Sequence, residues 1–178
     1  AINGARDVTW TSSGGDPGGY LSAGDLRGDT LWFFVAPADY LGDVSSAYGG
    51  TLTYRLKSDG TSAPLLTAYA DVQLLGTNGV RLAYTGGIAP SSNWSQYDVV
   101  LVADGSWRLG SLSGAAATAA DLQGVLSGLQ ELRIRGDYLQ AAETTSLDSV
   151  VLSAVPEPAN ALMLLAGVAL LGGLLRRR

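Results

Sequence analysis

The side chains that could do chemistry here are carboxylates, hydroxyls, aromatic rings and a few cations, because the 178-residue chain contains no histidine and no cysteine. Without these two residue types it can form no disulfide, no zinc site of the Cys/His kind and no Ser-His-Asp or Cys-His nucleophilic system. Catalysis would have to use the 16 Asp and Glu residues, tyrosines, Ser and Thr hydroxyls, Lys57 or the arginines.

Glycoside hydrolysis is a reaction that carboxylates alone can support. It needs two carboxyl groups about 5.5 Å apart for retention, or about 6.5 to 9.5 Å apart for inversion. The glutamates are Glu131, Glu143 and Glu157, and none stands in a recognisable acid/base context. We therefore expect a non-catalytic protein. A carbohydrate-active enzyme of unrecognised type is the alternative.

Trp94 follows a stretch rich in Gly, Ser and Asn between residues 86 and 93. Aromatic rings in such loops provide apolar faces on which sugar rings can stack. We therefore predict that Trp94 contacts a ligand, the alternative being a packing role. Trp10, Trp32 and Trp107 are predicted to pack in the core or at its edge.

The charge of the chain argues against nucleic acid as a partner. The formal net charge is -5, although three of the 11 basic residues stand together as Arg176, Arg177 and Arg178. The body that precedes them is thus more acidic than the whole chain. An acidic body without a basic stripe is a poor ligand for phosphate backbones.

The end of the sequence has the composition of a membrane segment. Residues 161–175 contain no polar side chain and are followed at once by the arginine cluster Arg176–Arg178. A helix of this length spans roughly 22 Å, compared with a hydrocarbon core of ~30 Å, so residues 158–160 must extend it. We predict a transmembrane-type helix at about residues 160–175, with the arginines on the cytoplasmic side. A buried core helix is the alternative.

Val155, Pro156, Glu157 and Pro158 stand immediately before this apolar segment. The order of a Val-Pro-Glu-Pro motif, a short apolar helix and a terminal arginine cluster resembles the PEP-CTERM protein-sorting signal of Gram-negative bacteria. The resemblance covers residues 155–178 and implies export, transient anchoring in the inner membrane, and processing by an exosortase-type membrane protease. The two prolines keep the motif extended and accessible. An uncleaved, tail-anchored envelope protein is the alternative.

The body of the chain alternates apolar and polar residues with a period of two, which predicts β-strands. In residues 51–57, Leu52, Tyr54 and Leu56 share one face, while Thr, Arg and Lys share the other. Similar stretches occur at 80–84, 97–102 and 131–135, and residues 31–35 and 150–152 read as strands buried on both faces. Turns rich in Gly, Ser, Asp and Asn separate them. This pattern indicates a β-sandwich or jelly roll.

One helix is predicted at about residues 119–128. Thr118 and Asp121 have the spacing of a capping box, and Leu122, Val125, Leu126 and Leu129 follow at intervals that form one apolar stripe. The predicted organisation is therefore a β domain at residues 1–154, with this one helix packed on it, and a sorting tail at residues 155–178.

Six segments of the β domain match the pattern of one known family. They are residues 18–21, 31–37, 40–43, 45–54, 132–138 and 147–152, of which the span from Tyr40 to Tyr54 is the most specific. Through these segments the chain, at about residues 8–153, resembles the laminin IV type A domain, also called the laminin B domain. The resemblance implies a galactose-binding-like jelly roll that serves as a non-catalytic, extracellular module. This chain lacks the cysteines and the flanking EGF-like modules of a laminin arm.

The laminin resemblance also implies candidate site residues. Relatives of this fold often hold a structural calcium ion between the first and last strands. Asp148 is the best-placed candidate ligand, and Asp16, near the Gly-rich N-terminal turn, could join it. The alternative is that Asp148 caps a turn or accepts backbone N–H hydrogen bonds. Calcium takes six to eight oxygen ligands, which backbone carbonyls could complete. Tyr40 and Tyr48 lie in the loop region of the family and are candidate ligand-binding residues together with Trp94, and their match to the family pattern indicates a structural role equally well.

Two Arg-Gly-Asp tripeptides, at residues 27–29 and 135–137, match the sequence that animal integrins bind. Such short motifs occur by chance. The second lies in an alternating strand, where no exposed loop presents it, so we do not expect adhesion to host receptors.

Together these observations predict an exported bacterial cell-surface or extracellular-matrix module. It would bind exopolysaccharide or another envelope component, without catalysis.

Overall fold

The computed structural model describes residues 8–25, 31–60, 65 and 67–154. These residues form an all-β sandwich of two five-stranded sheets with antiparallel pairing and one α-helix. The first sheet contains, in spatial order, β1 (Thr9–Gly15), β2 (Gly18–Asp25), β10 (Glu143–Leu152), β4 (Thr51–Ser58) and β7 (Ser95–Val100). The second contains β3 (Phe33–Val35), β9 (Leu129–Arg135), β5 (Val72–Gly76), β6 (Arg81–Tyr84) and β8 (Arg108–Leu109).

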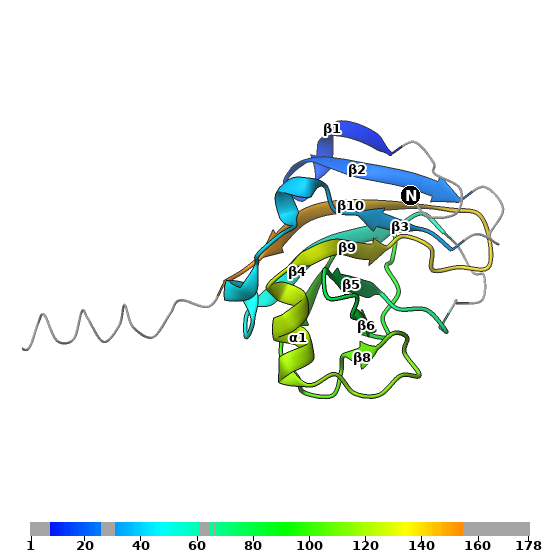
Figure 1. Ribbon diagram of the computed structural model, residues 1–178. Helices are drawn as coiled ribbons and strands as arrows, with labels where there is room; N and C mark the ends of the chain where they lie inside the picture. Colours follow the sequence, from blue (N-terminus) through cyan, green and yellow to red (C-terminus); the bar gives the residue numbers. More distant parts are fainter. Residues whose placement is uncertain (1–7, 26–30, 61–64, 66, 155–178) are drawn as a thin grey trace, which may run out of the picture.

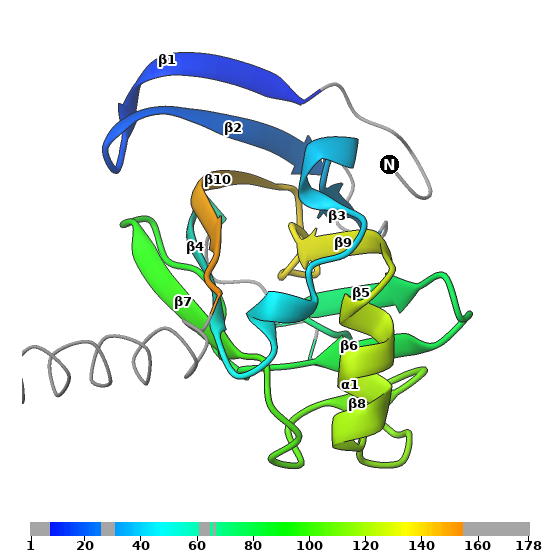
Figure 2. The same cartoon turned by 60° about the vertical axis from the view of Figure 1, so that its left-hand side comes forward.

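The strand order places distant parts of the chain side by side. Figures 1 and 2 show the first strands, in blue, next to the last strand, in orange. In this pairing β10 lies between β2 and β4, with Leu147 opposite both Leu21 and Leu56. β10 therefore joins β2 to β4 through residues that lie 126 positions (Leu21 and Leu147) and 91 positions (Leu56 and Leu147) apart in sequence, which no local pattern specifies.

The alternation in β4 is confirmed. Leu52, Tyr54 and Leu56 are buried, while Thr53 and Arg55 between them remain partly accessible. The inward side chains of β4 meet those of the second sheet and of α1 in one core. Core members that are at most 2% exposed include Trp107, Leu74, Leu82, Leu122, Leu126 and Ile134.

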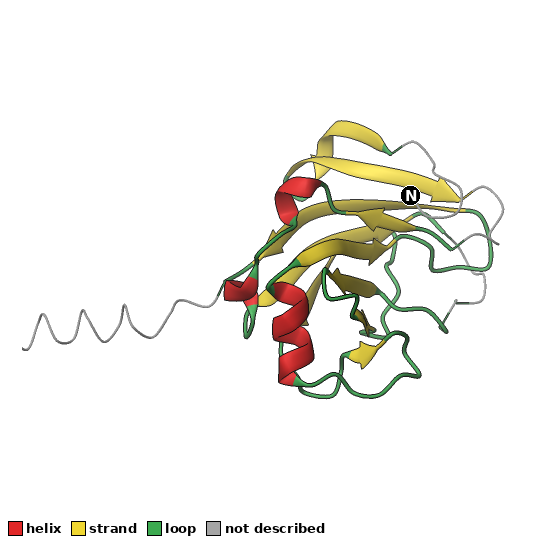
Figure 3. Cartoon of the chain, viewed as in Figure 1, coloured by secondary structure: helices red, strands yellow, loops and turns green. Residues whose placement is uncertain are grey.

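The predicted helix is also confirmed, as α1 (Ala119–Leu126), and it packs against β5 (Figure 3). Its capping box forms as expected: the Thr118 backbone N–H donates to Asp121 at 2.8 Å, and the Asp121 N–H donates to the Thr118 hydroxyl at 3.2 Å. The hydrogen bonds from the side chain and backbone of Thr118 lower the pKa of the Asp121 carboxyl. Two short 3₁₀ helices, η1 (Ala38–Tyr40) and η2 (Ser45–Ala47), connect β3 to β4.

Three expectations about burial are wrong. The sequence predicts a strand buried on both faces at residues 31–35, but β3 covers only Phe33–Val35 and Val35 is 39% exposed. Val151 is 50% exposed rather than buried, because a register shift between Asp148 and Val151 turns this part of β10 toward solvent. Trp10 is 63% exposed, because it lies on β1, an edge strand whose neighbour β2 carries glycine at position 19 beneath the ring.

The tail lies outside the described residues, as do the Val-Pro-Glu-Pro motif of residues 155–158, the predicted helix at 160–175 and the arginine cluster. Among the residues that the structure describes, no helix is both long and apolar enough to cross a membrane.

The stacked pair Tyr54 and Tyr97 gives a testable pH dependence. Their rings lie 5.3 Å apart across β4 and β7, and burial, with a smaller contribution from the charge of Asp71, raises the pKa of Tyr97 to about 12. An unfolded tyrosine loses its proton near pH 10. The raised pKa therefore contributes stability that is fully present below pH 10 and is lost as the pH rises from 10 to about 12.

We expect Tyr97→Phe to reduce this alkaline loss. The Tyr97 hydroxyl is buried and has no hydrogen-bond partner among the described residues, so at pH 7 the variant should lie within about 1 kcal/mol of the parent. Urea unfolding at several pH values between 7 and 12 measures both effects. An unchanged alkaline loss would contradict the assignment, and Tyr40→Phe, at an exposed position, is the control.

Candidate functional site

The outward side of the first sheet, called here the outer face, carries a row of polar side chains. Because Leu52, Tyr54 and Leu56 point inward, Thr53, Arg55 and Lys57 point outward. The strand register adds Asp148 and Gln96 beside Arg55. The Arg55 guanidinium donates to the side-chain amide oxygen of Gln96 at 3.2 Å, and the Thr53 hydroxyl donates to the Asp98 carboxylate at 2.8 Å.

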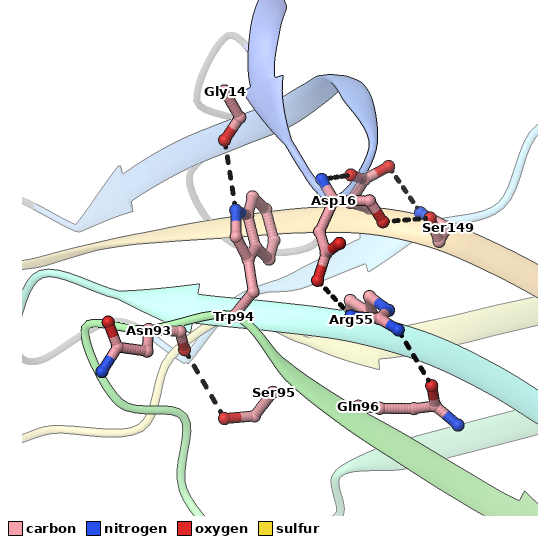
Figure 4. Close-up of polar contacts among 9 residues, drawn as sticks. Gly14, Asp16, Arg55, Asn93, Trp94, Ser95, Gln96 and Ser149 are labelled. Carbon is pink, nitrogen blue, oxygen red and sulfur yellow. Dashed lines mark hydrogen bonds and ion pairs between the residues drawn. The ribbon is translucent and has the colours of Figure 1, made fainter.

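An aromatic–lysine cluster of Tyr20, Lys57 and Trp94 stands at one end of this row. The Lys57 ammonium lies 4.6 Å from the centroid of each ring, and the two rings meet edge to face at 5.6 Å. The Trp94 indole N–H donates to the Gly14 carbonyl at 3.1 Å (Figure 4). Hence the ring predicted to contact a ligand is half-buried and fixed in position by a hydrogen bond and by both neighbours.

Asp16 and Asp148 do lie together, where the β1–β2 hairpin meets β10; Figure 4 shows Asp16 beside Ser149 and Arg55. One Asp148 carboxylate oxygen accepts the Asp16 backbone N–H at 2.5 Å, and the other accepts the Ser149 N–H at 2.6 Å. The Ser149 hydroxyl donates to the Asp16 carbonyl at 3.0 Å, and the Asp16 carboxylate forms an ion pair with Arg55. We call this group the hairpin clasp.

The hairpin clasp does not fit a calcium ion in this arrangement. Both oxygens of Asp148 already accept backbone N–H groups, and the carboxylate of Asp16 is paired with a guanidinium whose positive charge would repel the metal. Within the described part of the chain, no group of three or more acidic side chains could hold a metal ion. Ser149 reaches this geometry with a positive φ of 50° at the β10 register shift.

The other two predicted ligand-binding residues lie elsewhere. Tyr40 is 42% exposed and lines a cavity between the two sheets, on the inward side of the first sheet. Tyr48 is half-buried and packs against the core. Thus the structure does not bring Trp94, Tyr40 and Tyr48 into one site.

Tyr20 was not predicted from the sequence as a site residue, and Lys57 was named only as a possible catalytic side chain. The alternation of residues 51–57 already placed Lys57 on the polar face of its strand. The place of Tyr20 beside it depends on β10 separating β2 from β4, which local sequence does not reveal.

A buried polar cluster lies where β9 ends and β5 begins. Asp71 forms an ion pair with Arg135 at 3.5 Å and accepts hydrogen bonds from the Thr85 hydroxyl and the Gly86 N–H. The Arg135 guanidinium also lies 4.5 Å from the centroid of the Tyr138 ring. Because Arg135 is 3% and Asp137 0% exposed, the second Arg-Gly-Asp tripeptide is buried, as expected. The first lies outside the described residues.

The sandwich has relatives among known protein families. A sequence model of the family described as Laminin B (Domain IV) matches residues 33–164, well over half of the chain. The chain belongs to the laminin B family. Human laminin subunit alpha-3 is 35% identical over 135 residues, which is 75% of this chain and 4% of that protein. The chain thus spans a small fraction of the curated relative that it matches.

Solved structures agree with the laminin B assignment. The L4b domain of human laminin alpha-2 has a TM-score of 0.67 at 15% identity, covering 76% of this chain and 80% of that one. A family 11 carbohydrate-binding module of the cellulosomal cellulase Lic26A-Cel5E of Clostridium thermocellum has a TM-score of 0.51 at 16% identity, covering 85% and 82%. An exo-beta-agarase has a TM-score of 0.54 at 12% identity, covering 84% and 23%. These likenesses show the fold, and they fit the predicted jelly roll.

Proposed function

We propose that this laminin B domain is an extracellular, non-catalytic module that binds a polysaccharide of the bacterial envelope or matrix through its outer face. The observation that carries the proposal is the aromatic–lysine cluster at the end of the polar row on β4 and β7. Membership of the laminin B family supports an exported module, and the fold shared with a carbohydrate-binding module supports the ligand class.

The chemistry of the outer face suits a sugar. Sugars present apolar C–H faces together with hydroxyl groups, so they need an aromatic surface beside hydrogen-bonding side chains. Trp94 supplies the aromatic surface, and the exposed Gln96 and Asp98 supply the hydrogen-bonding side chains. Because hydrogen bonds and neighbouring rings already hold Trp94, binding loses little side-chain entropy there.

The two buried acidic side chains already accept hydrogen bonds within the protein, which supports a non-catalytic role. Asp71 and Glu143 accept hydrogen bonds from the protein itself. The cavity beside Asp71 has a volume of about 60 Å³, which is smaller than ordinary ligand sites of about 300 to 1,000 Å³. A general acid or base must lie within hydrogen-bond reach of its substrate, and a cavity of this size does not admit a sugar.

A glycan array tests the binding proposal. We expect the protein to bind at least one polysaccharide class and Trp94→Ala to weaken that binding at least tenfold, as loss of a central aromatic contact does. Trp10→Ala removes an exposed ring from the other side of the sheet and should leave binding unchanged. Absence of glycan binding, with the fold intact by circular dichroism, would contradict the proposal.

We also propose that residues 155–178 act as a PEP-CTERM sorting signal, recognised by an exosortase-type protease after export and transient anchoring in the inner membrane. The order of Val155–Pro158, the apolar segment and the arginine cluster supports it. Mass spectrometry of protein from the native host should find chains that end near Pro158. Chains that all retain residues beyond it would favour the uncleaved, tail-anchored alternative.

The family resemblance implies a calcium ion at Asp16 and Asp148, whereas the contacts of the hairpin clasp predict that none binds there. We expect the melting temperature to be the same in excess calcium and in EDTA, because a guanidinium and backbone N–H groups already satisfy the two carboxylates. Differential scanning fluorimetry measures this. A calcium-dependent rise in melting temperature that Asp148→Asn abolishes would show that the ion binds and displaces Arg55.

A further inference from the structure

The strands of the second sheet carry a charge of opposite sign to that of the chain as a whole. Their charged residues are Glu131 and the arginines Arg81, Arg108, Arg133 and Arg135, although the chain has a formal net charge of -5. Arg135 is buried and paired with Asp71. We call the remaining three arginines, together with Glu131, the arginine patch.

The register of the strands places the arginine patch on the outward side of the second sheet. One row of directly opposed residues consists of Arg133, Gln73, Ala83 and Arg108, and the neighbouring row consists of Glu131, Leu75 and Arg81. Leu132, Leu74 and Leu82 alternate with these positions and belong to the core, so both rows point away from it. The side chains of Arg81 and Arg133 are 31% and 12% exposed.

A single carboxylate holds two of the guanidinium groups. One Glu131 oxygen lies 2.7 Å from the Arg133 Nε, and the other accepts the Arg133 Nη2 at 2.8 Å, which is a bidentate contact. The first of these oxygens also lies 3.3 Å from Arg81, and the Gln73 amide oxygen accepts from both arginines at 3.3 Å. Two positive charges are therefore held side by side against one negative charge, which leaves a charge that a second anion can neutralise.

Arg108 adds a further positive charge beside this pair. It is partly exposed, and no ion-pair partner for it occurs among the described residues. It lies opposite Ala83, two residues along β6 from Arg81, and long side chains span this diagonal spacing. The arginine patch thus has three positive charges and one negative charge, and the guanidinium groups stay charged at any physiological pH.

We propose that the arginine patch binds an acidic polysaccharide through the carboxylates of its uronate residues. Guanidinium groups match carboxylates in a planar, bidentate geometry, as Arg133 and Glu131 already show. A single carboxylate at a partly exposed arginine gains little, because water and salt screen the charge. The ligand must therefore present several carboxylates at once, as a polymer does.

The arginine patch suits a polysaccharide better than a nucleic acid. Duplex DNA also presents many anions, but the acidic remainder of the chain repels its denser charge. The outer face belongs to the other sheet, so this proposal does not rest on the one made for that face.

Polygalacturonate and its methyl-esterified form are matched probes, because the ester removes the charge and keeps the sugar chain. We expect the intact protein to bind the charged polymer at least tenfold more tightly at about 20 mM salt. Raising the salt to about 500 mM should abolish this binding, since salt screens exposed charges. Isothermal titration calorimetry measures both effects.

Substitutions locate the binding. Arg81→Gln and Arg108→Gln should each weaken it about two- to fivefold, the value of one exposed ion pair, and about tenfold together. Glu131→Gln should instead tighten it severalfold, because two guanidinium groups lose their competing carboxylate. Asp59→Asn is the matched control: it makes the same charge change at the end of β4, and its amide oxygen can still accept the Thr144 N–H.

Four results would overturn the proposal. The first is equal binding of the two polymers. The second is an Asp59→Asn variant that tightens binding as much as Glu131→Gln, because net charge alone would then explain the effect. The third is duplex DNA that binds as tightly as polygalacturonate. The fourth is loss of polygalacturonate binding in Trp94→Ala, which would place the acidic polymer on the outer face.

Discussion

Replacement of Glu143 by alanine is expected to lower the free energy of unfolding by about 4 kcal/mol, which approaches half the stability of an ordinary domain. Glu143 is 3% exposed and begins β10. One of its carboxylate oxygens accepts the Ser58 hydroxyl at 2.8 Å, and the other accepts the backbone N–H groups of Tyr138 and Leu139, the latter at 2.9 Å. Truncation leaves three donors without their acceptor and opens a cavity.

Glu131 provides the matched control. It also forms ion pairs on a strand, with Arg133 at 2.7 Å and Arg81 at 3.3 Å, but its side chain is 21% exposed. Water can replace those partners, so Glu131→Ala should cost no more than about 1 kcal/mol. Urea unfolding of both variants gives the comparison. Equal losses would mean that the carboxylate of Glu143 does not hold the turn before β10 in place.

Glu143 also shows where sequence reasoning ends. Local patterns identified β4 and α1 correctly, because alternation and capping boxes depend on neighbours a few positions apart. They gave no sign that Glu143 is buried, since its partner Ser58 is 85 residues away in sequence. A carboxylate in a polar stretch resembles a solvated one until the fold brings donors to it.

For the candidate site too, the sequence indicated some residues but not the contacts they make. Family resemblance singled out Asp16 and Asp148, and the structure does place them together, yet the contacts between them are hydrogen bonds and an adjoining ion pair. Their chemistry depends on Arg55, whose approach follows from the pairing of β4 with β10. Likewise, Trp94 was conspicuous in its loop, but Lys57 and Tyr20 became its neighbours only through sheet order.

The first sheet therefore separates two surfaces of opposite character. Its outer face is polar and carries one aromatic–lysine cluster, whereas its inward side contributes Leu21 and Leu147 to an apolar slot. Of the two surfaces, the outer face suits the proposed sugar ligand, because sugars require hydrogen-bonding groups beside an apolar ring face.

Among the tryptophans, Trp107→Ala should be the most damaging change, with an expected loss of about 3 to 5 kcal/mol. The residue is 0% exposed, its ring packs on Tyr84 at 5.2 Å, and its indole N–H donates to the Val100 carbonyl. Alanine removes this apolar contact and leaves the Val100 carbonyl without its donor. Because Trp107 joins the second sheet to the end of β7, we expect the loss to appear as cooperative destabilisation of the whole sandwich.

Trp10→Ala is the matched control, since it removes the same side chain from the edge strand β1, where the ring is 63% exposed. It should cost less than about 1 kcal/mol, the range of surface substitutions. Chemical unfolding followed by circular dichroism, which does not depend on the lost fluorophore, measures both variants. If Trp10→Ala proved as costly as Trp107→Ala, the β1 ring would have to be buried in solution, against the apolar cavity that its partner Leu21 lines.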